Sequence, residues 1–193
     1  MITAVLPFLV SMSFTPGPNN IMVATSGVNF GFRRTLPHMF GITIGVALML
    51  LLVGFGLGQV FVAMPFVHPI LKAIAALYLI YFAWRIATAA RVGGADQPSR
   101  PLTVLQGAAF QCVNVKAWIV AVSGITTYTV IDESLPLQII QIAALSAGMA
   151  LLSVLCWTLF GQWLRQFLNT ARRLRWFNGA MAVLLIGSII PTL

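Results

Sequence analysis

Seven residues in two short groups could bind a charged small molecule inside an otherwise apolar chain. The first group is the run Pro16-Gly17-Pro18-Asn19-Asn20, and the second is Asn114 with Lys116. Asparagine amides both donate and accept hydrogen bonds, and a lysine ammonium can meet a carboxylate. A broken helix adds free carbonyls, which favour a cation, and free N–H groups, which favour an anion. We therefore predict that these seven residues bind a zwitterion and that the chain has no catalytic residues.

The run at 16–20 predicts a break in the first apolar segment. Thr15 precedes a proline, which disfavours helical geometry, and Pro18 suits the first position of a new helix. The segment should therefore form two half-helices. In hydrocarbon, irregular backbone is tolerated only where protein or a polar cavity receives its N–H and C=O groups.

The composition places these residues in a membrane protein. Of the 193 residues, 60% are hydrophobic and 7% charged, and the mean hydropathy is +0.97, whereas about a quarter of the residues in a soluble domain are charged. We expect an all-α membrane protein with six transmembrane helices, of which the first and possibly the fourth are broken at mid-membrane. The apolar segments are 2–30, 36–63, 66–90, 104–131, 136–165 and 176–193.

The net charge of +8 is confined to alternate loops. Arginines lie in the first, third and fifth loop regions, and Asp132 and Glu133 lie in the fourth. Because positive residues favour the cytoplasmic side, this pattern predicts that both termini lie outside. The alternation accounts for the charge, so no nucleic-acid partner is expected.

A polar linker at 91–103 divides the chain into two parts of three segments each, 1–90 and 104–193. An odd number of segments in each part predicts inverted repeats, as in many secondary transporters. Aligning Gly45–Gln59 with Gly148–Gln162 pairs identical residues at six of fifteen positions.

Helical rise places the two polar groups at similar depth. At about 1.5 Å per residue, Asn19 lies about 18 Å and Asn114 about 16 Å from the predicted cytoplasmic ends of their segments. Lys116 is the charged residue clearly within a segment, and we expect it to pair with a substrate carboxylate or carry a coupling proton. The alternative is a lysine that snorkels or bonds to carbonyls of the broken helix. His38 lies near a segment end, where a solvated or hydrogen-bonded histidine is expected rather than a proton relay.

These motifs resemble those of the lysine exporter family, which includes the homoserine and threonine exporters. The resemblance covers nearly the whole chain and is carried by Phe14-Thr15-Pro16-Gly17-Pro18-Asn19-Asn20, Gly31-Phe32-Arg33, Gly41 and Asn114-x-Lys116-Ala117. Within that family, the sequence is most similar to the cysteine and O-acetylserine exporters. The family commonly has Asn-Pro-Lys in its fourth segment, and Val115 replaces that proline, so the second break is left open.

The resemblance implies efflux of amino acids or their metabolites across the bacterial inner membrane, coupled to the proton gradient. It also implies that no cofactor or metal is used and that the partners are an amino-acid substrate and the lipid bilayer, with a possible homo-oligomer. Two alternatives are an intramembrane enzyme and a structural or assembly protein of the membrane. The enzyme is disfavoured because neither a Gly-x-Ser-x-Gly nor a His-Glu-x-x-His pattern occurs.

Overall fold

The computed structural model describes residues 2–57, 67–88 and 100–188, and every regular element in these ranges is a helix. The expected segment ends at 58–63, 89–90 and 189–193, and most of the linker, lie outside the described residues. The elements are α1 (Ile2–Phe14), α2 (Pro18–Phe30), α3 (Phe32–Leu52), the π-helical turn η1 (Val53–Leu57), α5 (Val67–Thr88), α6 (Val104–Gln111), α7 (Val115–Tyr128), α8 (Leu135–Arg165) and α9 (Ala171–Gly187).

The break predicted in the first apolar segment is present. Helix α1 ends at Phe14, and α2 begins at Pro18 with the proline at its first position. Proline is tolerated there because the first N–H group of a helix has no intrahelical partner. The backbone N–H of Thr15 donates to the carbonyl of Ser11 at 3.1 Å and closes the last turn of α1.

The fourth apolar segment is also broken, although it lacks the proline. Helices α6 and α7 are bent by 63° relative to each other. Between them, the N–H groups of Cys112, Val113 and Asn114 each bond to a carbonyl three residues earlier, which tightens the end of α6. The indole of Trp118 donates to the carbonyl of Cys112 at 2.8 Å. A tightened turn and a side-chain donor therefore hold this break.

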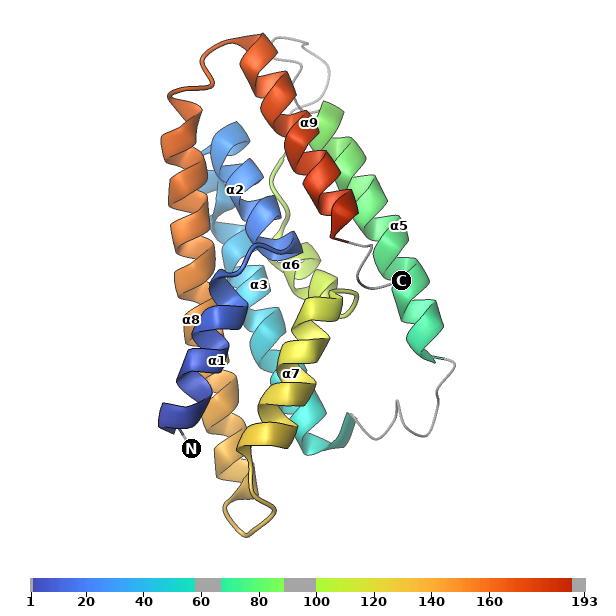
Figure 1. Cartoon of the computed structure of the whole chain (residues 1–193), viewed down its shortest axis with the longest axis vertical. Helices are drawn as coiled ribbons and strands as arrows, with labels where there is room; N and C mark the ends of the chain where they lie inside the picture. Colours follow the sequence, from blue (N-terminus) through green and yellow to red (C-terminus); the bar gives the residue numbers. More distant parts are fainter. Residues whose placement is uncertain (1, 58–66, 89–99, 189–193) are drawn as a thin grey trace.

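The two broken segments run in opposite directions (Figure 1). In the view shown, α1 and α2 ascend, α6 and α7 descend, and both breaks lie near mid-height, with the long helices α3 and α8 beside them. Helices α5 and α9 pack together at one side. This arrangement brings the breaks together, and the inverted repeat itself stays a prediction.

Two of the described helices can cross a membrane unaided, Phe32–Gly56 with 25 residues and Leu135–Arg165 with 31. The bent pair α6 and α7 passes the same length and hydropathy test as a third span. The chain is therefore an all-helical membrane protein, and the count of six spans stays a prediction.

Two helices begin earlier than the hydropathy pattern predicted. Helix α3 starts at Phe32 rather than 36, and α9 at Ala171 rather than 176. The hydroxyl of Thr170 accepts a hydrogen bond from the N–H of Arg173 at 3.3 Å and caps α9. Arginines expected in loops therefore lie in first helical turns, because a helix can extend beyond the apolar core into the polar interface.

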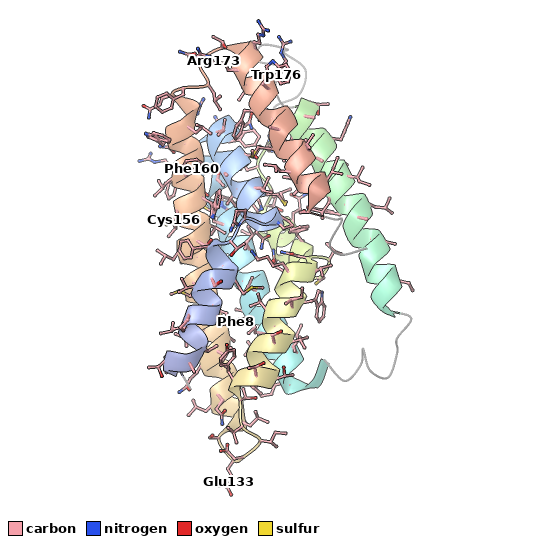
Figure 2. All side chains as sticks on the ribbon, viewed as in Figure 1. Phe8, Glu133, Cys156, Phe160, Arg173 and Trp176 are labelled. Atoms are coloured by element: carbon pink, nitrogen blue, oxygen red, sulfur yellow. The ribbon has the colours of Figure 1, made fainter. Side chains whose placement is uncertain are left out.

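The two ends of the molecule carry opposite charges. Figure 2 shows Arg173 and Trp176 at one end and Glu133 at the other. At the acidic end, Asp132 accepts hydrogen bonds from the hydroxyl and the N–H of Ser134, at 2.6 and 2.8 Å, and from Gln138. These bonds hold the pKa of Asp132 below its ordinary value.

Close contacts between backbones hold the half of the bundle nearer the basic end. A Cβ atom added at Gly27 would overlap the carbonyl oxygen of Thr158, and one at Gly161 would overlap that of Ala24. Helices α2 and α8 can approach this closely only because neither has a side chain at the crossing. By contrast, a Cβ at Gly124, in the other half of the bundle, would meet only ordinary contacts from 3.8 Å.

Candidate functional site

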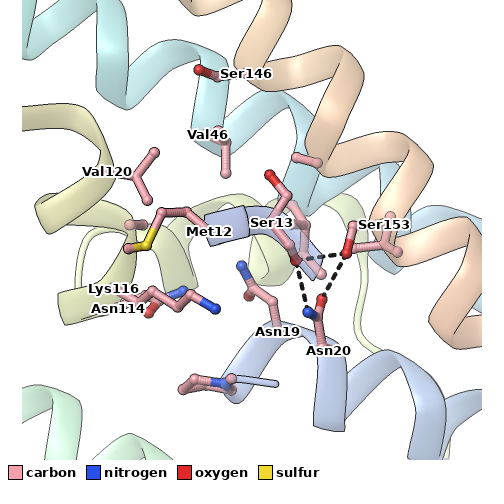
Figure 3. Close-up of a pocket in the computed structure, with 16 residues that line it drawn as sticks. Met12, Ser13, Asn19, Asn20, Val46, Asn114, Lys116, Val120, Ser146 and Ser153 are labelled. Atoms are coloured by element: carbon pink, nitrogen blue, oxygen red, sulfur yellow. Dashed lines mark hydrogen bonds between the residues drawn. The ribbon is translucent and has the colours of Figure 1, made fainter. Parts of the chain in front are cut away.

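A cavity lies between the two breaks, and we call it the central cavity (Figure 3). Its empty volume is about 570 Å³, including space open to solvent. Its lining comes from α1, α2, α3, α7, α8 and both breaks: Met12, Ser13, Gly17, Pro18, Asn19, Asn20, Ile42, Val46, Asn114, Lys116, Ala117, Val120, Ser146, Ala150, Ser153 and Val154. Six of the seven predicted site residues line it. The seventh, Pro16, is exposed in the first break and does not.

A buried amide stabilises the first break. The side-chain nitrogen of Asn20 donates to the carbonyls of Ser13 and Thr15, at 2.8 and 3.0 Å. The hydroxyl of Ser153 donates to the same Ser13 carbonyl at 2.7 Å and to the amide oxygen of Asn20 at 3.3 Å. These bonds satisfy carbonyls that the end of α1 would otherwise leave unpaired, and they attach the break to α8.

Amide side chains also join the two breaks to each other. Asn19 and Gln111 exchange two hydrogen bonds, of 2.9 and 3.1 Å. The amide nitrogen of Asn114 donates to the oxygen of Gln111 at 3.2 Å, and Gln111 donates to the carbonyl of Gly107 at 3.0 Å. The expectation that the half-sites face each other therefore agrees with the geometry of these residues.

Lys116 reaches from the second break to the first. Its Nζ atom donates to the carbonyl of Thr15 at 2.7 Å. A Cβ added at Gly17 would lie 3.1 Å from Cδ of Lys116 and 3.2 Å from Nζ, so the glycine leaves room for the lysine. The bond to a carbonyl of the broken helix is the arrangement described above as the alternative. Because an ammonium has three donors and this bond uses one, Lys116 can also meet a carboxylate.

Two helices begin at the central cavity without a side-chain cap. The N-cap residues are Gly17 for α2 and Asn114 for α7, and neither makes a capping side-chain bond. By contrast, Thr103 and Gln106 form a full capping box at the start of α6. An uncapped N-terminus carries partial positive charge and free N–H groups. Together with Lys116, these ends make the cavity favourable for a carboxylate.

Two buried polar atoms in the cavity lining have no hydrogen-bond partner within the described ranges. They are Oδ1 of Asn114 and Oγ of Ser146, on residues that are 4% and 2% exposed. Such unpaired atoms cost free energy unless a ligand or water satisfies them. Both can accept a hydrogen bond from an ammonium group. The cavity thus offers acceptors as well as cationic groups, which is what a zwitterion requires.

Acidic side chains are absent from the cavity lining. The acidic residues in the part of the chain that the structure describes are Asp132 and Glu133, both in the loop between α7 and α8. Across the same residues, no group of three histidine, cysteine or acidic side chains could hold a metal ion. The positive charge of Lys116 is therefore not neutralised by a carboxylate within the cavity.

Sequence reasoning missed four residues of this site: Ser13, Gln111, Ser146 and Ser153. A signal existed for two of them, because Ser146 and Ser153 are seven positions apart and so share a helix face. Serine is a weak signal in an apolar segment, since its hydroxyl can bond to a carbonyl of its own helix. Gln111 precedes Asn114 by one helical turn, a spacing at which side chains can touch.

Comparisons with known proteins agree with this site. The model of the LysE type translocator family matches residues 10–188. A cysteine/O-acetylserine efflux protein of Klebsiella pneumoniae subsp. pneumoniae is 31% identical over 185 residues, which are 95% of this chain and 93% of the relative. Proteins of the same name from Escherichia coli O139:H28 and Salmonella typhimurium are 28% identical over 188 and 190 residues, 96% of this chain and 94% of each relative. No solved structure matches the chain.

Proposed function

The chain belongs to the LysE type translocator family of membrane amino-acid efflux transporters, and we propose that its central cavity carries a small neutral amino acid out of the cytoplasm. The relatives are efflux proteins, so the chain is a transporter rather than an enzyme. The observation that carries the proposal is the pairing, in one cavity, of an ammonium group on Lys116 with buried, unpartnered acceptors on Asn114 and Ser146.

In the bound state, the substrate carboxylate lies against Lys116 and the uncapped starts of α2 and α7. The substrate ammonium lies against Oδ1 of Asn114 and Oγ of Ser146, the acceptors without partners. Asn19 and Asn20 hold the breaks in position through their bonds to Gln111 and Ser153. A substrate of this kind completes the hydrogen bonding of the cavity.

The substrate class follows from the relatives and the cavity lining. The relatives are named for efflux of cysteine and O-acetylserine, both neutral amino acids with small side chains. Without a carboxylate in its lining, the cavity is less suited to a cationic side chain such as that of lysine. We therefore propose cysteine, O-acetylserine or a similar neutral amino acid as the cargo.

The proposed architecture is six transmembrane helices in two inverted repeats, 1–90 and 104–193, joined by a cytoplasmic linker at 91–103. Opposite directions of the broken helices support the inversion. We place the protein in the bacterial inner membrane with the basic end in the cytoplasm and both termini outside. The arginines gathered at one end support this orientation.

Coupling to the proton gradient is part of the proposal, with Lys116 as the proton carrier. Support comes from the cavity lining, in which Lys116 is the titratable side chain. Release of its proton would weaken its hold on the substrate carboxylate and so link the two movements.

Reconstituted transport tests the proposal. Purified protein in liposomes should move labelled cysteine and O-acetylserine under an imposed pH gradient, and a protonophore should remove the accumulation. Lysine serves as the comparison substrate. Failure to move any neutral amino acid would contradict export, whereas transport that is insensitive to the protonophore would contradict only the coupling.

A further inference from the structure

A second cavity lies between the central cavity and the basic end, and we call it the arginine cavity. It involves α2, α3, α5 and the segment before α6, and its empty volume is about 410 Å³, including space open to solvent. Its lining residues are Met22, Thr25, Ser26, Asn29, Phe30, His38, Phe82, Arg85, Ile86, Arg100, Pro101 and Leu102. None of these residues lines the central cavity.

The charged side chains that line the arginine cavity are both positive. Arg85 donates to the backbone carbonyl of Arg100 at 3.2 Å, which brings the last turn of α5 against the segment before α6. That bond uses one of the five N–H groups of a guanidinium. No acidic residue lines the cavity. The cavity is therefore electrostatically suited to an oxyanion, which guanidinium groups bind through paired N–H groups.

His38 supplies a second, independent sign of a ligand. A solvated or hydrogen-bonded histidine was predicted here, but His38 is fully buried, and both ring nitrogens lack a partner among residues 2–57, 67–88 and 100–188. The prediction was wrong because α3 begins earlier than expected and carries His38 into the bundle. Glycine at 107 makes room for the ring, since a Cβ there would lie 3.2 Å from Cδ2 of His38. An imidazole that lines a cavity without a partner can donate to an anion.

The two cavities follow one another along the same helices. On α3, Ile42 lines the central cavity and His38, one turn nearer the basic end, lines the arginine cavity. Four residues of helix correspond to about 6 Å. On α2, Asn20 lines the central cavity and Thr25 the arginine cavity. A solute that enters at the basic end and reaches the central cavity along α2 and α3 passes the arginine cavity first.

We propose that the arginine cavity is a second binding site, which holds the carboxylate of the exported amino acid before it reaches the central cavity. Arg85 and Arg100 attract the carboxylate, and His38 donates a hydrogen bond to it from inside the cavity. The inference rests on the proposed export function for the identity of the ligand. The existence of an oxyanion site does not depend on transport.

Binding of acetate, a simple carboxylate, tests the site without transport. We use the Lys116→Met variant, in which the central cavity has lost its cation, and compare potassium acetate with potassium chloride at equal concentration. Acetate should raise the melting temperature by about 2 °C, because ligand binding stabilises the folded state. Adding Arg85→Gln should abolish the rise, and Arg85→Lys should retain part of it. No rise in Lys116→Met, or an equal rise after Arg85→Gln is added, would overturn the site.

Transport kinetics test the role of the site in export. In everted vesicles, whose cytoplasmic face is outside, Arg85→Gln and Arg100→Gln should each raise the KM for O-acetylserine about tenfold, the loss expected for one charged hydrogen bond. Maximal velocity should change less than twofold. Arg34→Gln is the matched control, because Arg34 is exposed and lines neither cavity. An equal rise in KM for Arg34→Gln would mean that surface charge alone is responsible and would overturn the role.

A lipid phosphate is the other source of an oxyanion at this end of the protein. Vesicles made from phosphatidylcholine alone, or with phosphatidylglycerol added, separate the two sources. The proposal predicts the same tenfold rise in both lipids. If removing phosphatidylglycerol reproduces the effect of Arg85→Gln in the unaltered protein, the site belongs to the lipid and the proposal fails. If the unaltered protein moves no amino acid, the export function fails, and the acetate experiment still decides whether the site exists.

Discussion

The break between α1 and α2 contains two prolines, whereas the break between α6 and α7 contains none. Both interrupt a helix beside the central cavity, and both leave the N-terminus of the following helix without a side-chain cap. In the first break, Asn20 binds the carbonyls that the end of α1 leaves free. In the second, a tightened turn and the indole of Trp118 do so.

The difference shows that side-chain partners, rather than proline, are common to the two breaks. Proline removes one donor and fixes one backbone angle, but the carbonyls freed by a break need partners in either case. Lys116 connects the two breaks directly, because it belongs to the second and donates to the carbonyl of Thr15 in the first. The predictions below test the two breaks against each other.

Replacing Lys116 by methionine should have the largest effect. The substitution removes the cation in the central cavity and the bond to the carbonyl of Thr15. Loss of one partner of a partly buried charge pair costs about 2 kcal/mol or more, so transport should fall at least about 30-fold. The measurement is the initial rate of O-acetylserine uptake in proteoliposomes, with Arg34→Gln as the control. An uptake rate within twofold of the unaltered protein would exclude Lys116 from the site.

Removing the amide of Asn20 should affect the first break more than removing the indole N–H of Trp118 affects the second. Asn20→Ala leaves two carbonyls and the hydroxyl of Ser153 with fewer partners, whereas Trp118→Phe removes the donor to one carbonyl. We expect losses of unfolding free energy of about 2 to 3 and about 1 kcal/mol. Melting temperatures in one detergent measure both. A larger shift for Trp118→Phe would contradict the assignment of the caps.

A methyl group at Gly17 should weaken transport moderately. The added carbon would lie 3.1 Å from Cδ of Lys116, so the lysine must move away from the carbonyl of Thr15. We expect about a fivefold loss in transport rate, corresponding to about 1 kcal/mol. Gly179→Ala is the matched control, because a Cβ there meets nothing within 4 Å. Equal rates for the two variants would show that Lys116 needs no space at Gly17.

Introducing the missing proline should have the smallest effect. Val115 is the first residue of α7, where a proline fits. Asn114 before it has φ −85° and ψ 98°, an extended conformation that a following proline accepts. Val115→Pro should therefore change transport less than twofold. Pro16→Ala should also be mild, because Pro16 lies outside the cavity lining. Loss of transport in Val115→Pro would show that the second break uses a different geometry.

The sequence predicted the first break and the polar groups that face each other, because prolines and a lysine in an apolar segment are costly and so carry information. It could not settle the second break. That break depends on Trp118 reaching back to Cys112, a contact that residue spacing does not reveal. Ser146 and Ser153 escaped notice because their role depends on α8 packing against α1, α2 and α3, which is a tertiary effect.

Helix ends show the same limit. Hydropathy marks where the apolar core begins, whereas Thr170 caps α9 in the polar region before it. The site of His38 was misjudged for this reason, since an earlier start of α3 carries that residue deeper into the bundle. Residues that lie within apolar segments were placed more reliably than residues at their ends.

The central claim is that substrate occupies the central cavity, and protection of a cysteine from labelling tests it most directly. Ser146→Cys, made after Cys112 and Cys156 are replaced by serine, puts one thiol in the cavity lining. Saturating O-acetylserine should slow its reaction with a small methanethiosulfonate at least fivefold. It should not slow the same reaction in a Leu105→Cys control, at a side chain that is 77% exposed. An unchanged rate at position 146, in a variant that still transports the substrate, would contradict the claim.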